Sequence, residues 1–149
     1  MNGQTDLCDA LCHVLGNTCR IGRTTKSYEW NVQGKGALMA EACFREQASE
    51  LEVAIEHLAR HIVGLGGRAI LDYSDAVVEV NPPTTSDVPD LATMVRNLKE
   101  GHTQAGLSVN AANDLAREAD EVASVKLLAD RLEAHRGHGR RLFLLAADV

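Results

Sequence analysis

Apolar residues recur at alternating spacings of four and three along four long segments of the chain. This spacing places the apolar side chains on one face of an α-helix. The segments cover residues 7–32, 44–65, 91–116 and 125–142. The pattern therefore predicts four helices of about 25–28 residues, each roughly 40 Å long at 1.5 Å per residue.

Glycines mark two of the expected helix ends. Gly34 and Gly36 interrupt the chain between the first and second segments, and Gly64, Gly66 and Gly67 follow the second. Glycine favours these places because it adopts the backbone conformations that end a helix. We therefore expect the first turn near residue 34 and the end of the second helix near residue 64.

A polar connector separates the second and third segments, at residues 68–88. Its middle, LDYSDAVVEV, is consistent with a short helix, and NPPTTSD then predicts a turn. Ser86 or Asp87 is expected to cap the third helix. Between the third and fourth segments, READEVAS contains neither Gly nor Pro, so periodicity alone does not place the last turn.

The length of the connector decides the fold class. A connection of about 20 residues can return along a bundle, so the second and third helices can run parallel, whereas a plain up-and-down bundle needs only a short loop. Aromatic residues are only 3% of the chain, which disfavours sandwiches and barrels. We predict one all-α domain over residues 1–149, a four-helix bundle with one long crossover.

Charge and hydropathy narrow the function classes. The net charge is −6, and the first 19 residues contain no Lys or Arg, so DNA binding through a basic arm is disfavoured. No stretch approaches the roughly 18 apolar residues of a membrane span. The N-terminus lacks the basic start of a signal peptide. We expect a cytoplasmic protein without a membrane partner.

Four cysteines are expected to be free thiols in a reducing compartment. They are Cys8, Cys12, Cys19 and Cys43. The first three share one helical stripe, which indicates packing. A metal knot with His13 is disfavoured because the chain has no CxxC pair.

The run EWNVQG at residues 29–34, with Phe44 beyond it, resembles the signature of the Dps proteins, mini-ferritins that protect DNA in starved cells. The matching positions are Trp30, Asn31, Val32, Gly34 and Phe44. Residues 58–67, LARHIVGLGG, are similar to the end of that family's second helix. Residues 117–145 are similar to its last turn and fourth helix, which places the turn near Ala119–Asp120.

The resemblance implies a ferritin-like fold and a hollow shell of twelve identical subunits. It also implies that iron is oxidised and stored inside the shell, with protection against oxidative stress. In such proteins the iron site lies at a dimer interface. One subunit supplies two His and an acidic residue, and its neighbour supplies an Asp and a Glu four residues apart on the second helix.

Carried over residue by residue, the resemblance gives an unusual set of side chains. Glu29 and Glu41 stand at the two His positions, and Arg45 stands at the first acidic position. Glu56 stands at the partner's Asp, and Arg60 at the partner's Glu. Three carboxylates and two guanidiniums therefore replace the expected ligands. Arginine stays protonated and cannot bind a metal.

Two interpretations follow. In the first, the metal site has become an ion-pair cluster between subunits. Glu41 and Arg45 are spaced i,i+4, as are Glu56 and Arg60, and this spacing brings helix side chains together. The side chains alone favour this metal-deficient oligomer.

In the second interpretation, the chain is a ferroxidase that oxidises Fe(II) with peroxide or oxygen. Glu29, Glu41 and Glu56 would bind the iron, assisted by His57 and His61, while the arginines turn away. The family resemblance favours this activity.

Three other side chains lie outside this set of candidate ligands. His102 and His135 lie on the apolar rows of the third and fourth helices, which indicates hydrogen-bonded core histidines that can pair across the bundle. No His follows a Glu by three residues, so a di-iron site inside one bundle is not expected. Trp30 is a large apolar anchor, interpreted as a packing residue that the resemblance places beside the iron site.

Overall fold

The computed structural model describes residues 3–69 and 88–148 of the chain. This part of the chain contains four long helices and no strand. They are α1 (Gly3–Asn31), α2 (Ala37–Gly64), α4 (Leu91–Glu118) and α5 (Val122–Asp148). The predicted all-α class and number of long helices are confirmed.

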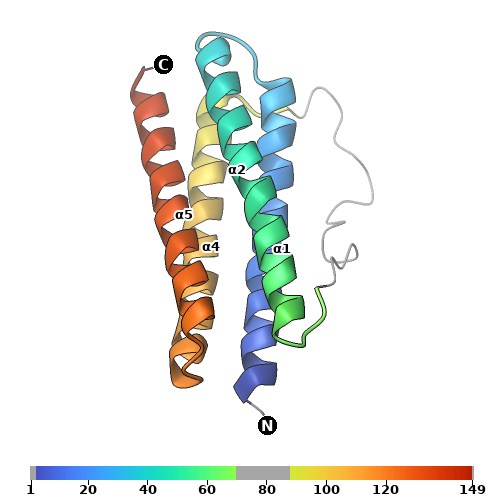
Figure 1. Ribbon diagram of the computed structural model, residues 1–149. Coiled ribbons are helices and arrows are strands. Elements are labelled where there is room, and N and C mark those ends of the chain that lie inside the picture. Colours follow the sequence, from blue (N-terminus) through green and yellow to red (C-terminus); the bar gives the residue numbers. More distant parts are fainter. Residues whose placement is uncertain (1–2, 70–87, 149) are drawn as a thin grey trace.

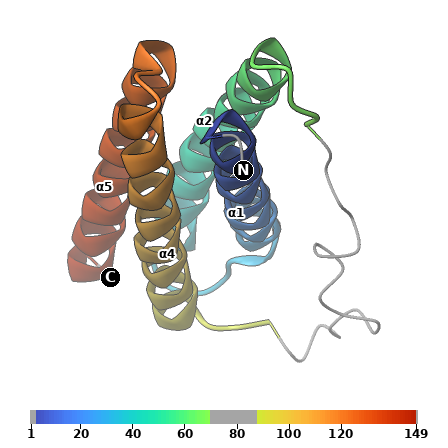
Figure 2. The same ribbon diagram turned by 90° about the horizontal axis from the view of Figure 1, so that it is seen from below.

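The four helices form a bundle in which α1 and α5 run one way while α2 and α4 run the other (Figure 1). The second and third long helices are therefore parallel, as the length of the connector predicts. The closest neighbours are α4 with α5, α1 with α2, and α1 with α4, whereas α2 and α5 meet at fewer points. Figure 2, seen from below, shows the same four helices around a common centre. The expected short helix at residues 71–80 lies outside the described residues.

The start of α4 differs from the expectation. Asp90 is its N-cap, and the Asp90 side chain accepts a hydrogen bond from the backbone N–H of Thr93 at 2.8 Å. Ser86 and Asp87, the predicted caps, lie outside the described residues. Asp90 was missed because Ser86 and Asp87, which are also capping residue types, precede it in the same polar stretch.

The end of α2 explains its two consecutive glycines. Gly66 has φ of +89°, a conformation that favours glycine, and its N–H donates to the carbonyl of Val63 at 3.0 Å. The next N–H, of Gly67, donates to the carbonyl of Ile62 at 3.0 Å. This pair of bonds is the Schellman motif. A Cβ on Gly67 would lie 3.0 Å from the Cys8 sulfur, so the second glycine allows close packing.

The turn between α4 and α5 lies at Ala119–Asp120, where the resemblance places it. Asp120 has φ of +53°, and its N–H donates to the carbonyl of Arg117 at 3.1 Å. Aspartate tolerates this left-handed conformation better than most residues. The tight turn therefore forms without Gly or Pro.

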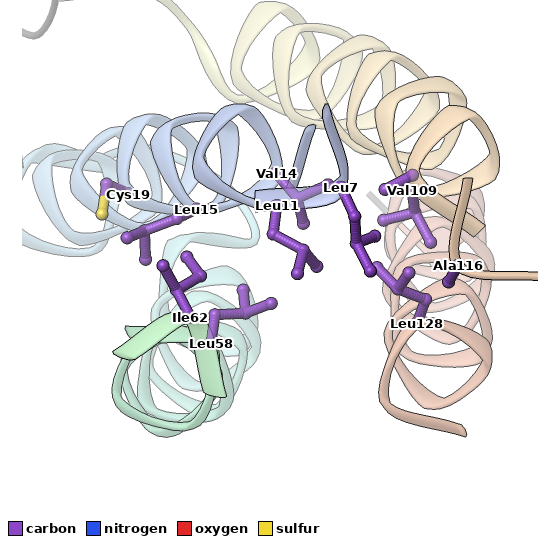
Figure 3. Close-up of a cluster of buried hydrophobic side chains, with 11 residues drawn as sticks. Leu7, Leu11, Val14, Leu15, Cys19, Leu58, Ile62, Val109, Ala116 and Leu128 are labelled. Atoms are coloured by element: carbon purple, nitrogen blue, oxygen red, sulfur yellow. The ribbon is translucent and has the colours of Figure 1, made fainter. Parts of the chain in front are cut away.

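The bundle interior contains two large apolar clusters, one toward each end, and a small one formed by Ile21, Leu51 and Ala105. The first joins all four helices, and in Figure 3 its side chains, from Leu7 of α1 to Leu128 of α5, point toward one another. The second surrounds Phe44 and Met94, which are both fully buried. Burying such side chains stabilises the fold by about 1.5–3 kcal/mol each.

Polar side chains also gather between the two large apolar clusters and form a polar layer there. Seven polar or charged side chains are buried or half-buried at this level of the helices: Thr25, Gln47, Glu50, His102, Arg131, His135 and His138. Gln47 donates a hydrogen bond to the carbonyl of His138 at 3.2 Å. Polar groups at such depth are costly unless paired, so their partners determine how this level packs.

Candidate metal centre

Glu29 occupies the end of α1 and is only 7% exposed. Its Oε1 accepts a hydrogen bond from Nε of Arg45, on α2, at 3.0 Å. Its Oε2 lies 3.0 Å from Nζ of Lys26, one turn earlier on α1. One buried carboxylate thus meets two cations, Lys26 from its own helix and Arg45 from across the hairpin.

The two cations keep Glu29 ionised. Burial raises the pKa of its carboxyl group, but the hydrogen bonds and positive charges of Lys26 and Arg45 outweigh burial and lower the pKa below its ordinary value. A carboxylate must be deprotonated to bind a cation. Glu29 therefore has the protonation state of a metal ligand, while its present partners are the protein's own cations.

Arg45 also connects Glu29 to Glu41. Its Nη2 lies 2.6 Å from Oε1 of Glu41, so one guanidinium bridges two carboxylates. The Arg45 side chain is 58% exposed, and an exposed ion pair contributes only about 0–1 kcal/mol. Its displacement by a divalent cation would cost the fold little.

The remaining predicted ligands lie elsewhere on the same chain. Glu56 pairs with Arg60 at 2.7 Å on the surface of α2, and His57 is exposed. His61 shares a hydrogen bond of 2.7 Å with the hydroxyl of Ser124, on α5.

A single copy does not gather these ligands. Glu56 is about 22 Å along α2 from Glu41 at 1.5 Å per residue. Within residues 3–69 and 88–148, no three His, Cys, Asp or Glu side chains are placed to hold one metal ion. Glu29 and Glu41 could meet Glu56 only through a second copy.

Trp30 does not pack inside the bundle. Its side chain is 71% exposed, and Nζ of Lys26 lies 6.0 Å from the ring centroid. Trp30 therefore does not pack inside one subunit, and its packing beside an iron site between subunits stays a prediction. Leu38 and Met39, across the turn at the start of α2, are exposed as well. This end of the bundle therefore presents an apolar surface beside Glu29.

Sequence reasoning missed Lys26 as a member of the site. The ion pair between Lys26 and Glu29 was predictable, because the two residues are spaced i,i+3 on one helix. The contact between Glu29 and Arg45 had no such local signal. It joins two helices and depends on how the hairpin closes.

The polar layer contains the two predicted core histidines. The Nδ1 atoms of His102 and His135 lie 2.9 Å apart, so one ring donates a hydrogen bond and the other accepts it. This pairing across the bundle agrees with the prediction. Burial is the main cause that lowers the pKa of His102 to about 3, and neighbouring positive groups add to it. Burial likewise lowers the pKa of His135 to about 4.

Glu50 forms a second polar assembly that sequence reasoning missed. Arg131, on α5, donates two hydrogen bonds to the Glu50 carboxylate at 2.6 and 3.2 Å. Nε2 of His138 lies 2.8 Å from the same carboxylate. Burial raises the pKa of Glu50, yet the bonds to His138 and Arg131 outweigh it and lower the pKa to about 2.

The states of the cysteines and the hydropathy of the helices were also predicted. All four cysteines are free. Among the described residues, no helix has the length and hydropathy needed to cross a membrane.

Comparison with known proteins identifies the family. The model of the ferritin-like domain matches residues 8–145. The DNA protection during starvation protein of Brevibacillus brevis is 26% identical over 121 residues, which are 81% of this chain and 79% of that protein.

Two solved structures share the fold. The Dps protein of Vibrio cholerae O1, described as a ferritin-like diiron-carboxylate protein, has a TM-score of 0.82 and 24% identity, with 97% of this chain and 89% of that chain covered. The dodecameric thioferritin of Bacteroides fragilis has a TM-score of 0.85 and 17% identity, with 97% and 86% covered. The sequence's resemblance to the Dps proteins is thus confirmed, and the chain belongs to the ferritin-like family.

Proposed function

We propose that this protein binds and oxidises iron, stores it within a shell of identical subunits, and so protects the cell against oxidative stress. The observation that carries the proposal is the Glu29 carboxylate, which is buried, ionised and bridged to Glu41 at an apolar end of the bundle. Membership of the ferritin-like family over residues 8–145 supports it.

In this proposal iron is the substrate and the cargo. Glu29 and Glu41 of one copy bind Fe(II) through carboxylate oxygens, which suit this ion. Glu56 of a second copy completes the site, with His57 and His61 nearby. Arg45 and Arg60 turn toward solvent when the cation enters, because two guanidiniums would repel it. Each Fe(II) gives one electron to oxygen or hydrogen peroxide, and one peroxide molecule accepts two electrons and two protons to form two waters.

The test compares iron handling by the native protein and a paired variant. Glu29→Gln with Glu41→Gln removes both charges and keeps the side-chain shapes. We expect this variant to lose Fe(II) oxidation under peroxide and to retain less iron on purification. Glu118→Gln with Glu133→Gln, two exposed positions outside the site, is the matched control and should behave like the native protein. Native protein without bound iron and without oxidation above background would refute the proposal.

A second function is favoured by a different observation. Arg45 already bridges Glu29 and Glu41, and Arg60 already pairs with Glu56. We propose as the alternative a structural oligomer that binds no metal and whose subunits are held by these Glu–Arg pairs.

The alternative is tested by reversing both arginines. Arg45→Asp with Arg60→Glu should raise affinity for Fe(II) and weaken assembly in the absence of metal, because the carboxylates lose their cations. Arg117→Asp with Arg140→Glu is a charge-matched control on exposed positions. If the first variant changes neither metal affinity nor assembly relative to the control, the alternative is discarded.

A further inference from the structure

A cavity of about 300 Å³ lies between α4 and α5, away from the candidate metal centre. Lys99, Asn110 and Arg136 contribute polar side chains to its lining, and the ring pair His102 and His135 forms part of the wall. No acidic residue lines the cavity. Its volume is at the lower end of small-ligand sites.

The two cations of this cavity are exposed and differ from the arginines that form ion pairs. Arg45, Arg131 and Arg141 each pair with a carboxylate. By contrast, Arg136 makes no ion pair with any residue in the ranges 3–69 and 88–148. Nζ of Lys99 lies 5.3 Å from the ring centroid of Phe143 and likewise has no carboxylate partner within those ranges.

The local charge decides what the cavity attracts. The protein as a whole carries −6, which would repel an anion at long range. Charges separated by more than about 10 Å are largely screened at 0.1 M salt. The cavity lining offers the amide of Asn110 and the cations of Lys99 and Arg136, which have no carboxylate partner in the described part of the chain, and this set suits the oxygens of a phosphate.

Glycine keeps the cavity open. Gly106 of α4 lies in its lining, and a Cβ there would lie 3.7 Å from Cδ1 of Leu132. That is an ordinary contact, so the fold does not require glycine at this position. Glycine inside a helix costs about 1 kcal/mol relative to alanine, and here it leaves room between the two helices.

We propose that the cavity between α4 and α5 binds a small phosphate-type oxyanion, with Lys99 and Arg136 as its cationic contacts. The site is independent of iron. A free phosphate fills only part of the volume, so both inorganic phosphate and a phosphate ester are sources of the same chemistry.

Calorimetric titration of the assembled protein with inorganic phosphate at low ionic strength tests the site. Lys99→Ala with Arg136→Ala should weaken binding at least about tenfold, because both charge-assisted contacts to the phosphate are lost. Arg96→Ala with Arg117→Ala removes the same charge from exposed positions of α4 that do not line the cavity, and should change binding less than about twofold. Equal weakening by both pairs, or no phosphate binding by the native protein, would overturn the proposal.

A second pair of variants tests whether phosphate binds inside the cavity or is attracted only by the positive charge of the surface. Gly106→Met fills the cavity without changing charge and should also weaken phosphate binding about tenfold. Gly137→Met, on α5 where a Cβ meets nothing within 4 Å, is the matched control. Unchanged affinity in Gly106→Met would overturn the proposal.

AMP as a second probe distinguishes the sources. Binding of AMP that is tighter than that of inorganic phosphate assigns the site to a phosphate ester, and equal or weaker binding assigns it to free phosphate. Duplex DNA that binds the native protein and Gly106→Met alike, with no response to phosphate, would overturn the proposal in favour of a surface contact.

Discussion

The two polar assemblies of this chain differ in how completely one subunit satisfies them. At the end of the bundle, Glu29 and Glu41 share the exposed Arg45, and no third ligand is near among residues 3–69 and 88–148. In the central layer, Glu50 is held by Arg131 and His138, and His102 meets His135. The charged groups of the central layer find partners within one chain, although Nε2 of His102 and Nε2 of His135 have no hydrogen-bond partner among the described residues. The end of the bundle instead offers carboxylates to something outside it.

Because of this difference, we expect one assembly to contribute mainly to stability and the other mainly to function. Buried polar groups that are paired become costly to disturb, because removing one partner leaves the other unsatisfied in a region of low dielectric. Exposed ion pairs contribute little to stability. We therefore expect changes in the central layer to alter the free energy of unfolding, and changes at the end of the bundle to alter binding and assembly.

The largest effect should come from acid acting on His102 and His135. Their pKa values of about 3 and 4 lie below the ordinary 6.5. Between these values the two histidines bind protons in the unfolded chain and stay neutral in the folded chain. Stability should therefore fall as the pH drops below 6.5. By pH 4.5 the loss reaches about 5 kcal/mol for two groups over two pH units.

Urea unfolding at fixed protein concentration across this pH range measures the loss. His102→Leu with His135→Leu removes both groups and should flatten this part of the pH dependence. Imidazole shifts in an NMR titration report the pKa values directly. A variant whose stability falls in parallel with that of the native protein would contradict the assignment.

The next largest effect should follow Arg131→Met, which keeps most of the side-chain volume. Arg131 is 5% exposed and holds the Glu50 carboxylate. Its loss should reduce the free energy of unfolding by about 2–3 kcal/mol, because Glu50 keeps only His138 as a partner. Urea unfolding measures the change, and the exposed Arg140→Met is the control. Equal stability of the two variants would show that the central layer is not held by this pair.

A smaller effect is expected for Glu29→Gln. Its partners Lys26 and Arg45 are both largely exposed, so the free energy of unfolding should fall by at most about 1 kcal/mol. The same change should reduce binding of Fe(II) clearly more than it reduces stability. If Glu29→Gln lowers the free energy of unfolding by as much as Arg131→Met does, then the end of the bundle stabilises the fold. The proposed difference between the two assemblies would then be wrong.

The smallest effect on the subunit should come from Trp30→Ala. An exposed side chain contributes within about 0.5 kcal/mol to the stability of its own fold. Aromatic residues are nevertheless frequent anchors of interfaces, so we expect sedimentation analysis to show smaller oligomers. Phe143→Ala, another exposed aromatic residue, on α5, is the control. Assembly that is insensitive to Trp30→Ala would remove this end of the bundle as the contact surface between copies.

Much of the fold was predictable because its signals are local. The four apolar rows predict α1, α2, α4 and α5, and the glycines at 66 and 67 predict the end of α2. The pairs Glu41–Arg45 and Glu56–Arg60 follow from helical spacing, and both are formed. The N-cap of α4 was misplaced because several polar residues precede that helix, and only the backbone geometry selects Asp90.

Long-range contacts were harder to predict. Arg131 and Glu50 are 81 positions apart, and Arg45 and Glu29 are 16 apart. Each contact requires two helices to be aligned along their axes, and a shift of one turn would move either partner by about 5.4 Å. The periodicity of apolar residues predicts which face of a helix is buried. It does not predict how far one helix is shifted along its axis relative to another. For this reason Glu50 and Arg131 were not recognised.

The sequence by itself determined which faces of the four helices are apolar, where two of the turns fall, and that Glu41 with Arg45 and Glu56 with Arg60 are spaced to pair on α2. These features depend on residue type and on spacing within one helix. Only the tertiary structure decided that Arg45 bridges Glu29 and Glu41, that His102 meets His135, and that Trp30 faces outward. Those outcomes depend on how the helices pack against one another, because a side chain's partner on another helix is set by the alignment of both.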